Sequence, residues 1–226
     1  MSLPSGYKRL EYIQSTGTQY VDSGFKPNQN TRVIMDVKLL SQTTANIGIF
    51  GVRDVVMANE AKKFIAWSMS TGSSIRSDYF GTYANVLKST SIVGNRIILD
   101  KNKNICKFGS VVLTNTSATG QCTKSIYLLC TNDGGTPNYH ATANLYSCKI
   151  YDNDVLVRDF IPCQKPDGTI GLWDDVNSVF YGNAGTGTFT AGPVVASPSI
   201  FVNIDGIWKP INHIYVNINN IWQKST

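Results

Sequence analysis

The sequence feature that most constrains the fold is a series of short runs rich in β-branched and aromatic residues, each followed by turn-forming residues. Such runs are typical of strands, because these side chains pack well on a pleated surface. The residues between them are mainly Gly, Asn, Asp and Ser, which favour tight turns. The pattern predicts strands at Thr31–Leu40, Lys63–Met69, Arg96–Asp100, Ser125–Cys130 and Ala143–Tyr151.

Hairpins and helices are the next elements that the pattern constrains. Val93–Phe108 is typical of a hairpin that turns at Asn102–Asn104, and Lys149–Phe160 of one that turns at Asn153-Asp154. The single helix-like stretch, Val55–Lys63, is short and has no apolar stripe that could face a core. Many short strands without crossover helices predict an all-β chain, folded as an antiparallel sandwich or barrel.

Composition excludes several classes of protein. Of the 226 residues, 42% are hydrophobic and 15% charged, which favours a chain with a buried core over a disordered one. The net charge of +5 is dispersed, with no basic run longer than Lys62-Lys63, so we expect no nucleic-acid binding. No apolar segment is long enough for a membrane helix, and the N-terminus lacks the pattern of a signal peptide. We therefore expect no membrane insertion and no export by the general secretory route.

The cysteines are odd in number and show no C-x-x-C spacing. Only His140 and His213 are present to assist them, which argues against a zinc site. Most of them fall within apolar strand patterns, where a free cysteine packs as a small hydrophobic residue. We predict buried, reduced thiols and folding in a reducing cytoplasm. The cysteines are Cys106, Cys122, Cys130, Cys148 and Cys163.

Several blocks of sequence occur in the order typical of a known family. They are LPSGYKRLEYIQSTGTQYVDSGF at Leu3–Phe25, IFGVR at Ile49–Arg53, the strand from Arg76 to Tyr79, LYSCKIYDNDVLVRDFIPC at Leu145–Cys163, and GTIGLWDDVNSVFYGNAGTGTFTAG at Gly168–Gly192. Together they resemble the laminin-G-like, concanavalin A-type jelly-roll domains of bacteriophage and prophage structural proteins. The chain departs from that family at Trp173, where a Tyr is usual, and at Asp154, where a Gly is usual.

The resemblance implies a fold and a biological setting. It implies a two-sheet jelly-roll sandwich over residues 3–192. It also implies a non-enzymatic virion protein (a head fibre, a tail or baseplate decoration, or a receptor-binding component) that is assembled in the bacterial cytoplasm. Its partners would be other virion proteins or further copies of itself, and a host cell-surface glycan. The alternative is a carbohydrate-binding, lectin-like module of a bacterial surface protein.

Catalytic residues are not evident in the sequence. Glycoside hydrolysis needs two nearby carboxylates, yet neither Glu11 nor Glu60 has an acidic neighbour two or four residues away. The Asp152/Asp154 and Asp174/Asp175 clusters fall in turns, where Asp commonly shapes the backbone. Neither histidine lies in a triad-like motif. We therefore predict no enzyme activity, no cofactor and no metal site.

Sugar recognition would use aromatic rings flanked by polar side chains that hydrogen-bond hydroxyl groups. An aromatic residue inside a strand is more often part of a core, so each candidate has a structural alternative. The candidate ligand-binding residues are Arg53, Trp67, Arg76, Tyr79, Tyr83 and Tyr139.

The C-terminal segment repeats itself, with Ile200–Lys209 aligning on Ile214–Gln223. Residues 193–199 contain two prolines and small side chains, as a semi-rigid linker would. Each repeat predicts a hairpin, and hairpins this small are barely stable alone. We expect residues 200–226 to form a docking or oligomerisation tail, the alternative being a cap on the jelly roll. The candidate assembly residues are Phe201, Trp208, Tyr215 and Trp222.

Overall fold

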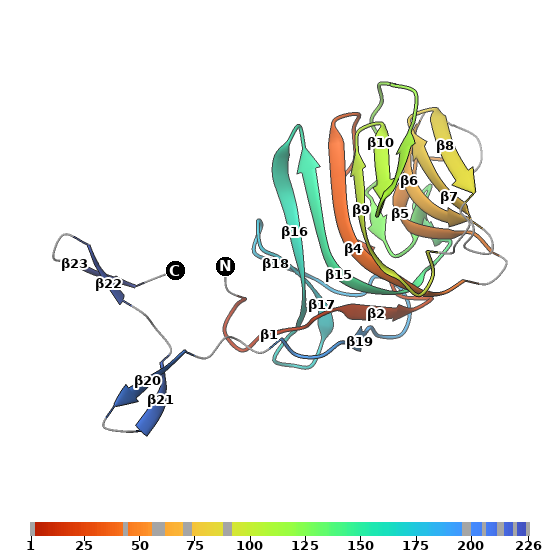
Figure 1. Ribbon diagram of the computed structural model, residues 1–226. Coiled ribbons are helices and arrows are strands. Elements are labelled where there is room, and N and C mark those ends of the chain that lie inside the picture. The colour runs from red at the N-terminus through yellow and green to blue at the C-terminus, as the bar shows by residue number, and fades with distance from the viewer. Residues whose placement is uncertain are drawn as a thin grey trace. The chain divides into compact units, whose positions relative to one another are not determined.

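The computed structural model describes residues 3–42, 45–55, 62–69, 74–87 and 92–195, together with the backbone of four strands beyond them (Figure 1). The chain divides into two compact units, Leu3–Val194 and a smaller unit that contains the chain from Val195 onward. The first unit is a sandwich of two sheets, which confirms the prediction of an all-β jelly-roll architecture. Within the described residues, no helix is long and apolar enough to span a membrane.

The larger sheet is antiparallel throughout. Its main path runs in the order β11 (Val111–Thr114), β10 (Ile105–Phe108), β9 (Arg96–Asn102), β4 (Thr31–Ser41), β15 (Thr142–Asp152), β16 (Val155–Gln164), β17 (Ile170–Asp174) and β18 (Val179–Tyr181). Three short strands join this path: β1 (Lys8–Arg9) pairs with β16, β2 (Ile13–Thr16) pairs with β15, and β19 (Thr190–Ala191) pairs with β2.

The smaller sheet faces the larger one and contains a single parallel pair, between β13 and β5. Its main path runs in the order β14 (Thr136–Asn138), β13 (Thr131–Asp133), β5 (Ile47–Arg53), β6 (Lys63–Met69), β7 (Ser74–Tyr79) and β8 (Thr82–Leu87). Two further strands, β3 (Val21–Asp22) and β12 (Tyr127–Leu128), pair with each other, and β12 also pairs with β5.

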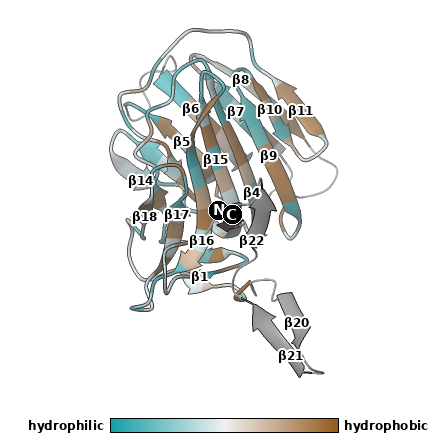
Figure 2. Ribbon diagram, turned by 90° about the vertical axis from the view of Figure 1, so that its left-hand side faces the viewer, coloured by the Kyte–Doolittle hydropathy of each residue, from teal (hydrophilic) through white to brown (hydrophobic). Residues whose placement is uncertain are grey.

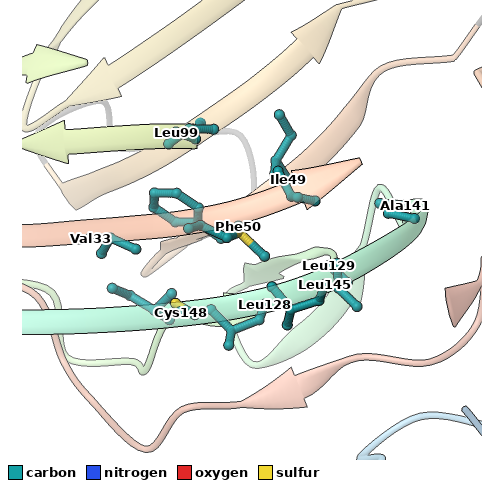
Figure 3. Close-up of a cluster of buried hydrophobic side chains, with 14 of the residues drawn as sticks. Val33, Ile49, Phe50, Leu99, Leu128, Leu129, Ala141, Leu145 and Cys148 are labelled. Carbon is teal, nitrogen blue, oxygen red and sulfur yellow. The ribbon is translucent and has the colours of Figure 1, made fainter. Parts of the chain in front are cut away.

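The core lies between the two sheets and follows from strand periodicity. Along β4, buried and partly exposed residues alternate, so that Val33, Met35 and Val37 all point inward and are fully buried. Figure 3 shows side chains of both sheets meeting in this layer, Val33 and Cys148 from the larger sheet and Phe50 from the smaller. Each large apolar side chain buried here contributes roughly 1.5–3 kcal/mol of transfer free energy. Figure 2 shows the resulting succession of hydrophobic and hydrophilic residues along strands such as β9.

The predicted strand at Ser125–Cys130 is the one that the structure changes most. Only Tyr127–Leu128 pairs as a strand there, and Leu129 takes a positive φ of 68° that ends it. The backbone N–H of Leu129 donates to the carbonyl of Ile49 at 2.9 Å, which holds this unusual conformation against β5. The chain then starts a separate strand, β13, that runs parallel to β5. Propensity could not show this break, because tertiary hydrogen bonds impose it.

The two predicted hairpins are present where the turn residues indicated. Asn153 and Asp154 both have positive φ (49° and 66°) between β15 and β16, as a two-residue hairpin loop requires. Lys103 has φ 55° between β9 and β10. The short stretch between Val55 and Lys63 lies mostly outside the described residues.

The two ends of the first unit meet. Gln14 and Ile13 of β2 pair with Thr190 and Ala191 of β19. Beyond that strand, the N–H of Glu11 donates to the carbonyl of Pro193 at 2.8 Å, and Leu10 forms a β-bridge with Val194. The first unit therefore extends through Val194, two residues past the expected boundary, and includes the start of the expected linker.

Two separate hairpins follow, β20 (Ile200–Ile204) with β21 (Ile207–Ile211) and β22 (Tyr215–Ile218) with β23 (Ile221–Lys224). Their registers are equivalent, since Trp208 pairs with Asn203 in the first hairpin and Trp222 with Asn217 in the second. The backbone thus reproduces the 14-residue repeat of the sequence. The side chains of the candidate assembly residues Phe201, Trp208, Tyr215 and Trp222 lie outside the described part of the structure.

The five cysteines lie buried within the sandwich as free thiols. Burial raises the pKa of Cys106 to about 11 and the pKa of both Cys122 and Cys163 to about 12. A thiol with so high a pKa holds little thiolate near neutral pH and is a weak nucleophile. Their placement is that of hydrophobic packing residues, Cys106 and Cys148 belonging to the main core.

Candidate ligand-binding pocket

The outer face of the smaller sheet carries a cluster of polar and aromatic side chains. Phe64 and Ala66 of β6 belong to the core, so the alternation of the strand places Lys63 and Trp67 on the opposite face. The same alternation along β7 directs Ile75 and Tyr79 into the core and Arg76 and Asp78 outward. Because β5, β6 and β7 are neighbours (Figure 1), these outward side chains are gathered in one region.

A pocket of about 210 Å³ opens in this region. It is smaller than the roughly 300–1,000 Å³ of typical drug-sized ligand sites, and so suits a small group such as one terminal sugar ring. Most of its wall comes from neighbouring strands, with Asn46 just before β5 and Tyr139 just after β14. The lining residues are Asn46, Arg53, Lys63, Trp67, Met69, Arg76, Asp78 and Tyr139.

Asp78 organises one side of the pocket. Its carboxylate is almost fully buried, at 2% exposure, and accepts hydrogen bonds from Trp67 Nε1 and from Arg76 Nε, each at 2.6 Å. These are charge-assisted bonds that fix both partner side chains in place. The guanidinium of Arg76 also stacks over the ring of Tyr83, 4.2 Å from its centroid. One carboxylate thus orients an indole and a guanidinium at the pocket wall.

Arg53 and Asp133 organise the other side. They are paired residues of β5 and β13, both buried, and the guanidinium donates to both carboxylate oxygens through Nε and Nη2. The guanidinium also lies 5.7 Å from the ring centroid of Tyr139, which meets Trp67 edge to face at 5.1 Å. The hydrogen bonds that Arg53 donates to Asp133 raise the pKa of Arg53 above its usual value, so its charge is permanent.

Four of the six candidate ligand-binding residues line this pocket together: Arg53, Trp67, Arg76 and Tyr139. Tyr83 is 59% exposed and lies beside the pocket, under the guanidinium of Arg76. Tyr79 does not join them. It is a core residue at 3% exposure, and its hydroxyl donates to the carbonyl of Gln29 at 2.8 Å.

Sequence reasoning missed the residues that support the pocket. Asp78 could have been found, because it lies two residues after Arg76 on a predicted strand and must share its face. Asp133 could not, since its pairing with Arg53 depends on the parallel register of β13 and β5, which no local pattern indicates. The remaining lining residues that were missed are Asn46, Lys63 and Met69.

In the part of the chain that the structure describes, no group of three or more His, Cys, Asp or Glu side chains is placed to hold a metal ion. The turn aspartates act locally instead. Asp152 accepts from Asn28 and Asn153, and Asp174 accepts from the backbone of Asp159 and from Asn177. These bonds brace hairpin turns, as expected of Asp in such positions.

No protein-family model matches the sequence, and no curated protein is significantly similar to it.

Proposed function

We propose that this chain is a non-enzymatic bacteriophage structural protein of the receptor-binding kind, whose sandwich unit holds a host-surface glycan in the outer-sheet pocket. The observation that carries the binding role is the convergence of Arg53, Trp67, Arg76 and Tyr139 on one small pocket. The virion setting is supported by the sequence blocks that resemble phage jelly-roll domains.

The chemistry of the pocket suits recognition of a sugar. Hydroxyl groups need hydrogen-bond donors and acceptors at fixed positions, which Asn46 and the Asp78–Arg76 pair supply. The apolar face of a sugar ring needs aromatic contact, which Trp67 and Tyr139 offer at the wall. Because these groups are held by strands and by one another, binding would require little ordering of side chains.

The acidic groups of the pocket favour a binding role over a hydrolytic one. Glycoside hydrolysis uses two carboxyl groups about 5–10 Å apart across the scissile bond. Among the described lining residues only Asp78 is acidic, and both of its oxygens are engaged, by Trp67 and by Arg76. We expect the protein to retain polysaccharide without releasing sugar from it.

Filling the pocket tests this proposal without altering its charge. Met69→Trp adds a large ring at the lining, and we expect it to abolish retention of bacterial surface polysaccharide in affinity electrophoresis. The control is Leu87→Trp, which adds the same ring at the 80% exposed end of β8, outside the lining. Equal retention by both variants and the unmodified protein would contradict binding in this pocket.

The alternative setting, a lectin-like module of a bacterial surface protein, would use the same pocket. Labelling purified virions with an antibody to this protein and imaging them by electron microscopy separates the two. Label on tail tips supports the receptor-binding role and label on capsids a decoration role. Label on cells but not on virions would contradict the virion assignment.

The hairpin tail is the proposed site of assembly. Truncation after Val195 keeps the pairing of Pro193 and Val194 with the first strand region, and removes both hairpins. We expect the melting temperature of the sandwich to change little, because the two units are separately compact. We expect self-association or incorporation into particles to be lost, as measured by light scattering. If both forms are monomers and the truncation alone lowers the melting temperature steeply, the docking role is wrong.

A further inference from the structure

We propose that the outer-sheet pocket selects a saccharide that carries a carboxylate, such as a uronic or sialic acid, and that Arg76 is the residue that binds this carboxylate. This inference rests on the proposed function, since it names the ligand class of the same pocket. Its basis is the distribution of charge and of hydrogen-bond donors around the pocket.

Among the charged residues of the described lining, cations outnumber anions. Arg53, Lys63 and Arg76 carry positive charge, and Asp78 alone carries negative charge. Asp133 compensates the charge of Arg53 and Asp78 that of Arg76, so what the pocket offers an anion is the set of guanidinium donors that Asp78 leaves unused. The small, partly enclosed volume strengthens the attraction for an anionic group, since water screens charges less there than at an open surface.

The two arginines are not equivalent as receptors for an anion. Arg53 is occupied, because its Nε and Nη2 both donate to Asp133. Arg76 is fixed through Nε alone, and among the described residues no acceptor engages its Nη1 or Nη2. Its side chain remains 26% exposed at the pocket. The geometry therefore leaves on Arg76 the paired donors that bind a carboxylate through two parallel hydrogen bonds.

The guanidinium of Arg76 is also held in one plane. Tyr83 lies 4.2 Å beneath it, and the bond to Asp78 prevents rotation about the end of the side chain. A pre-oriented fork loses little entropy when it binds, which favours a planar carboxylate. Trp67 and Tyr139 also line the pocket, in contact with each other, and can contact the ring that bears this carboxylate. The site thus combines an acid-binding fork with a surface for one sugar ring.

The test compares acidic with neutral probes on the full-length protein by isothermal titration calorimetry. The acidic probes are D-glucuronic acid, D-galacturonic acid and N-acetylneuraminic acid, and the neutral ones are D-glucuronamide, D-glucose and N-acetylglucosamine. We expect at least one acid to bind about tenfold or more tightly than the neutral sugars, the value of one charged hydrogen-bonded contact. D-glucuronamide is the decisive comparison, because it keeps the shape of glucuronic acid and lacks the charge.

Matched arginine variants assign the effect to one residue. Arg76→Met should remove the preference for acid, and Arg76→Lys should keep part of it, because the charge remains without the fork. The control is Arg96→Met, since Arg96 likewise pairs with a carboxylate (Asp36) and stacks on a tyrosine (Tyr146, 3.7 Å from the centroid), but lies on the other sheet. We expect Arg96→Met to bind as the unmodified protein does. Thermal unfolding of each variant verifies that it is folded.

The outcomes separate this inference from the function on which it rests. Equal affinity for acidic and neutral sugars, lost in the pocket-filling variant Met69→Trp, would overturn the acid selectivity and leave glycan binding standing. Tighter binding of glucose 6-phosphate than of any carboxylated sugar would also overturn it, in favour of a phosphate site. Binding of no saccharide at all would overturn both the inference and the proposed function.

Discussion

Asp133→Ala should destabilise the sandwich by about 3–5 kcal/mol, the effect expected when one partner of a buried ion pair is removed. Asp133 is 2% exposed and holds the guanidinium of Arg53, which is itself 7% exposed, through both of its carboxylate oxygens. Without the carboxylate, a permanent charge remains buried between β5 and β13 with two unsatisfied donors. The measurement is the free energy of unfolding in guanidinium chloride, monitored by tryptophan fluorescence.

Two control variants show whether loss of the Arg53–Asp133 ion pair causes the destabilisation. Asp36→Ala removes the carboxylate of a comparable arginine pair with Arg96, but that arginine is 49% exposed, so we expect a loss below about 1 kcal/mol. The double variant Arg53→Met, Asp133→Leu replaces both charges with apolar groups and should regain most of the stability. If Asp133→Ala costs no more than Asp36→Ala, the pair does not stabilise the junction of β5 with the parallel strand β13.

Lys101→Met should have the opposite effect and stabilise the protein by about 1–3 kcal/mol at neutral pH. Lys101 is fully buried between the sheets, where its Nζ donates to Ser77 Oγ at 2.6 Å and lies 4.7 Å from the ring centroid of Phe64. One hydroxyl and two aromatic faces, those of Phe64 and Tyr79, compensate the ammonium only in part. Methionine keeps the length of the stem and removes the charge.

The stability gained by Lys101→Met should depend on pH. Whether it grows or shrinks with pH follows from the direction in which the pKa of Lys101 is shifted. Burial lowers the pKa of Lys101, and the opposing influences of Cys106 and Asp78 do not restore it. The unfolded chain keeps its proton up to the ordinary lysine pKa of about 10.4, so between the lowered pKa of the folded state and that value folding releases a proton. The stability of the unmodified protein therefore rises with pH through this window, and the advantage of Lys101→Met shrinks as pH approaches 10.

Urea unfolding of both proteins at pH 7 and pH 9.5 measures this difference. The other buried titrating groups are common to the two proteins, and Cys106, which interacts with Lys101, has a pKa of about 11, above both pH values, so the difference isolates Lys101 to first order. A variant that is less stable than the parent at both pH values would mean that the contacts of the ammonium with Ser77 and the two rings outweigh its burial.

Strand periodicity predicted most of the sandwich, because burial on one face determines it. The run Thr31–Leu40 became β4, which alternates between buried and partly exposed residues, and Lys63–Met69 became β6, which is buried at every residue but the last. The break at Leu129 and the parallel register of β13 were not predictable, since they depend on hydrogen bonds to β5. Pairing between strands distant in the chain leaves no local signal in either sequence.

The residues of the pocket were also predictable in part. Aromatic and arginine residues of the central strands gave the candidates Arg53, Trp67 and Arg76, and a loop gave Tyr139; the fold brings these four together. Tyr79 shows the limit of that reasoning, because one position along a strand separates an outward residue from a core residue. Which residue takes which face depends on register, and register is set by the whole sheet.

The central claim, that the outer-sheet pocket holds a glycan, is tested most directly at the indole of Trp67. Its Nε1–H donates to Asp78 inside the pocket, so its ¹H–¹⁵N resonance should respond to a ligand there. The measurement is a titration of the ¹⁵N-labelled full-length protein with oligosaccharides released from bacterial surface polysaccharide, with Trp67→Phe to assign the resonance. We predict a saturable shift of Trp67 while Trp173, on the larger sheet, stays in place. Shifts confined to Trp208 and Trp222 of the hairpins, or no shift of any indole, would contradict the claim.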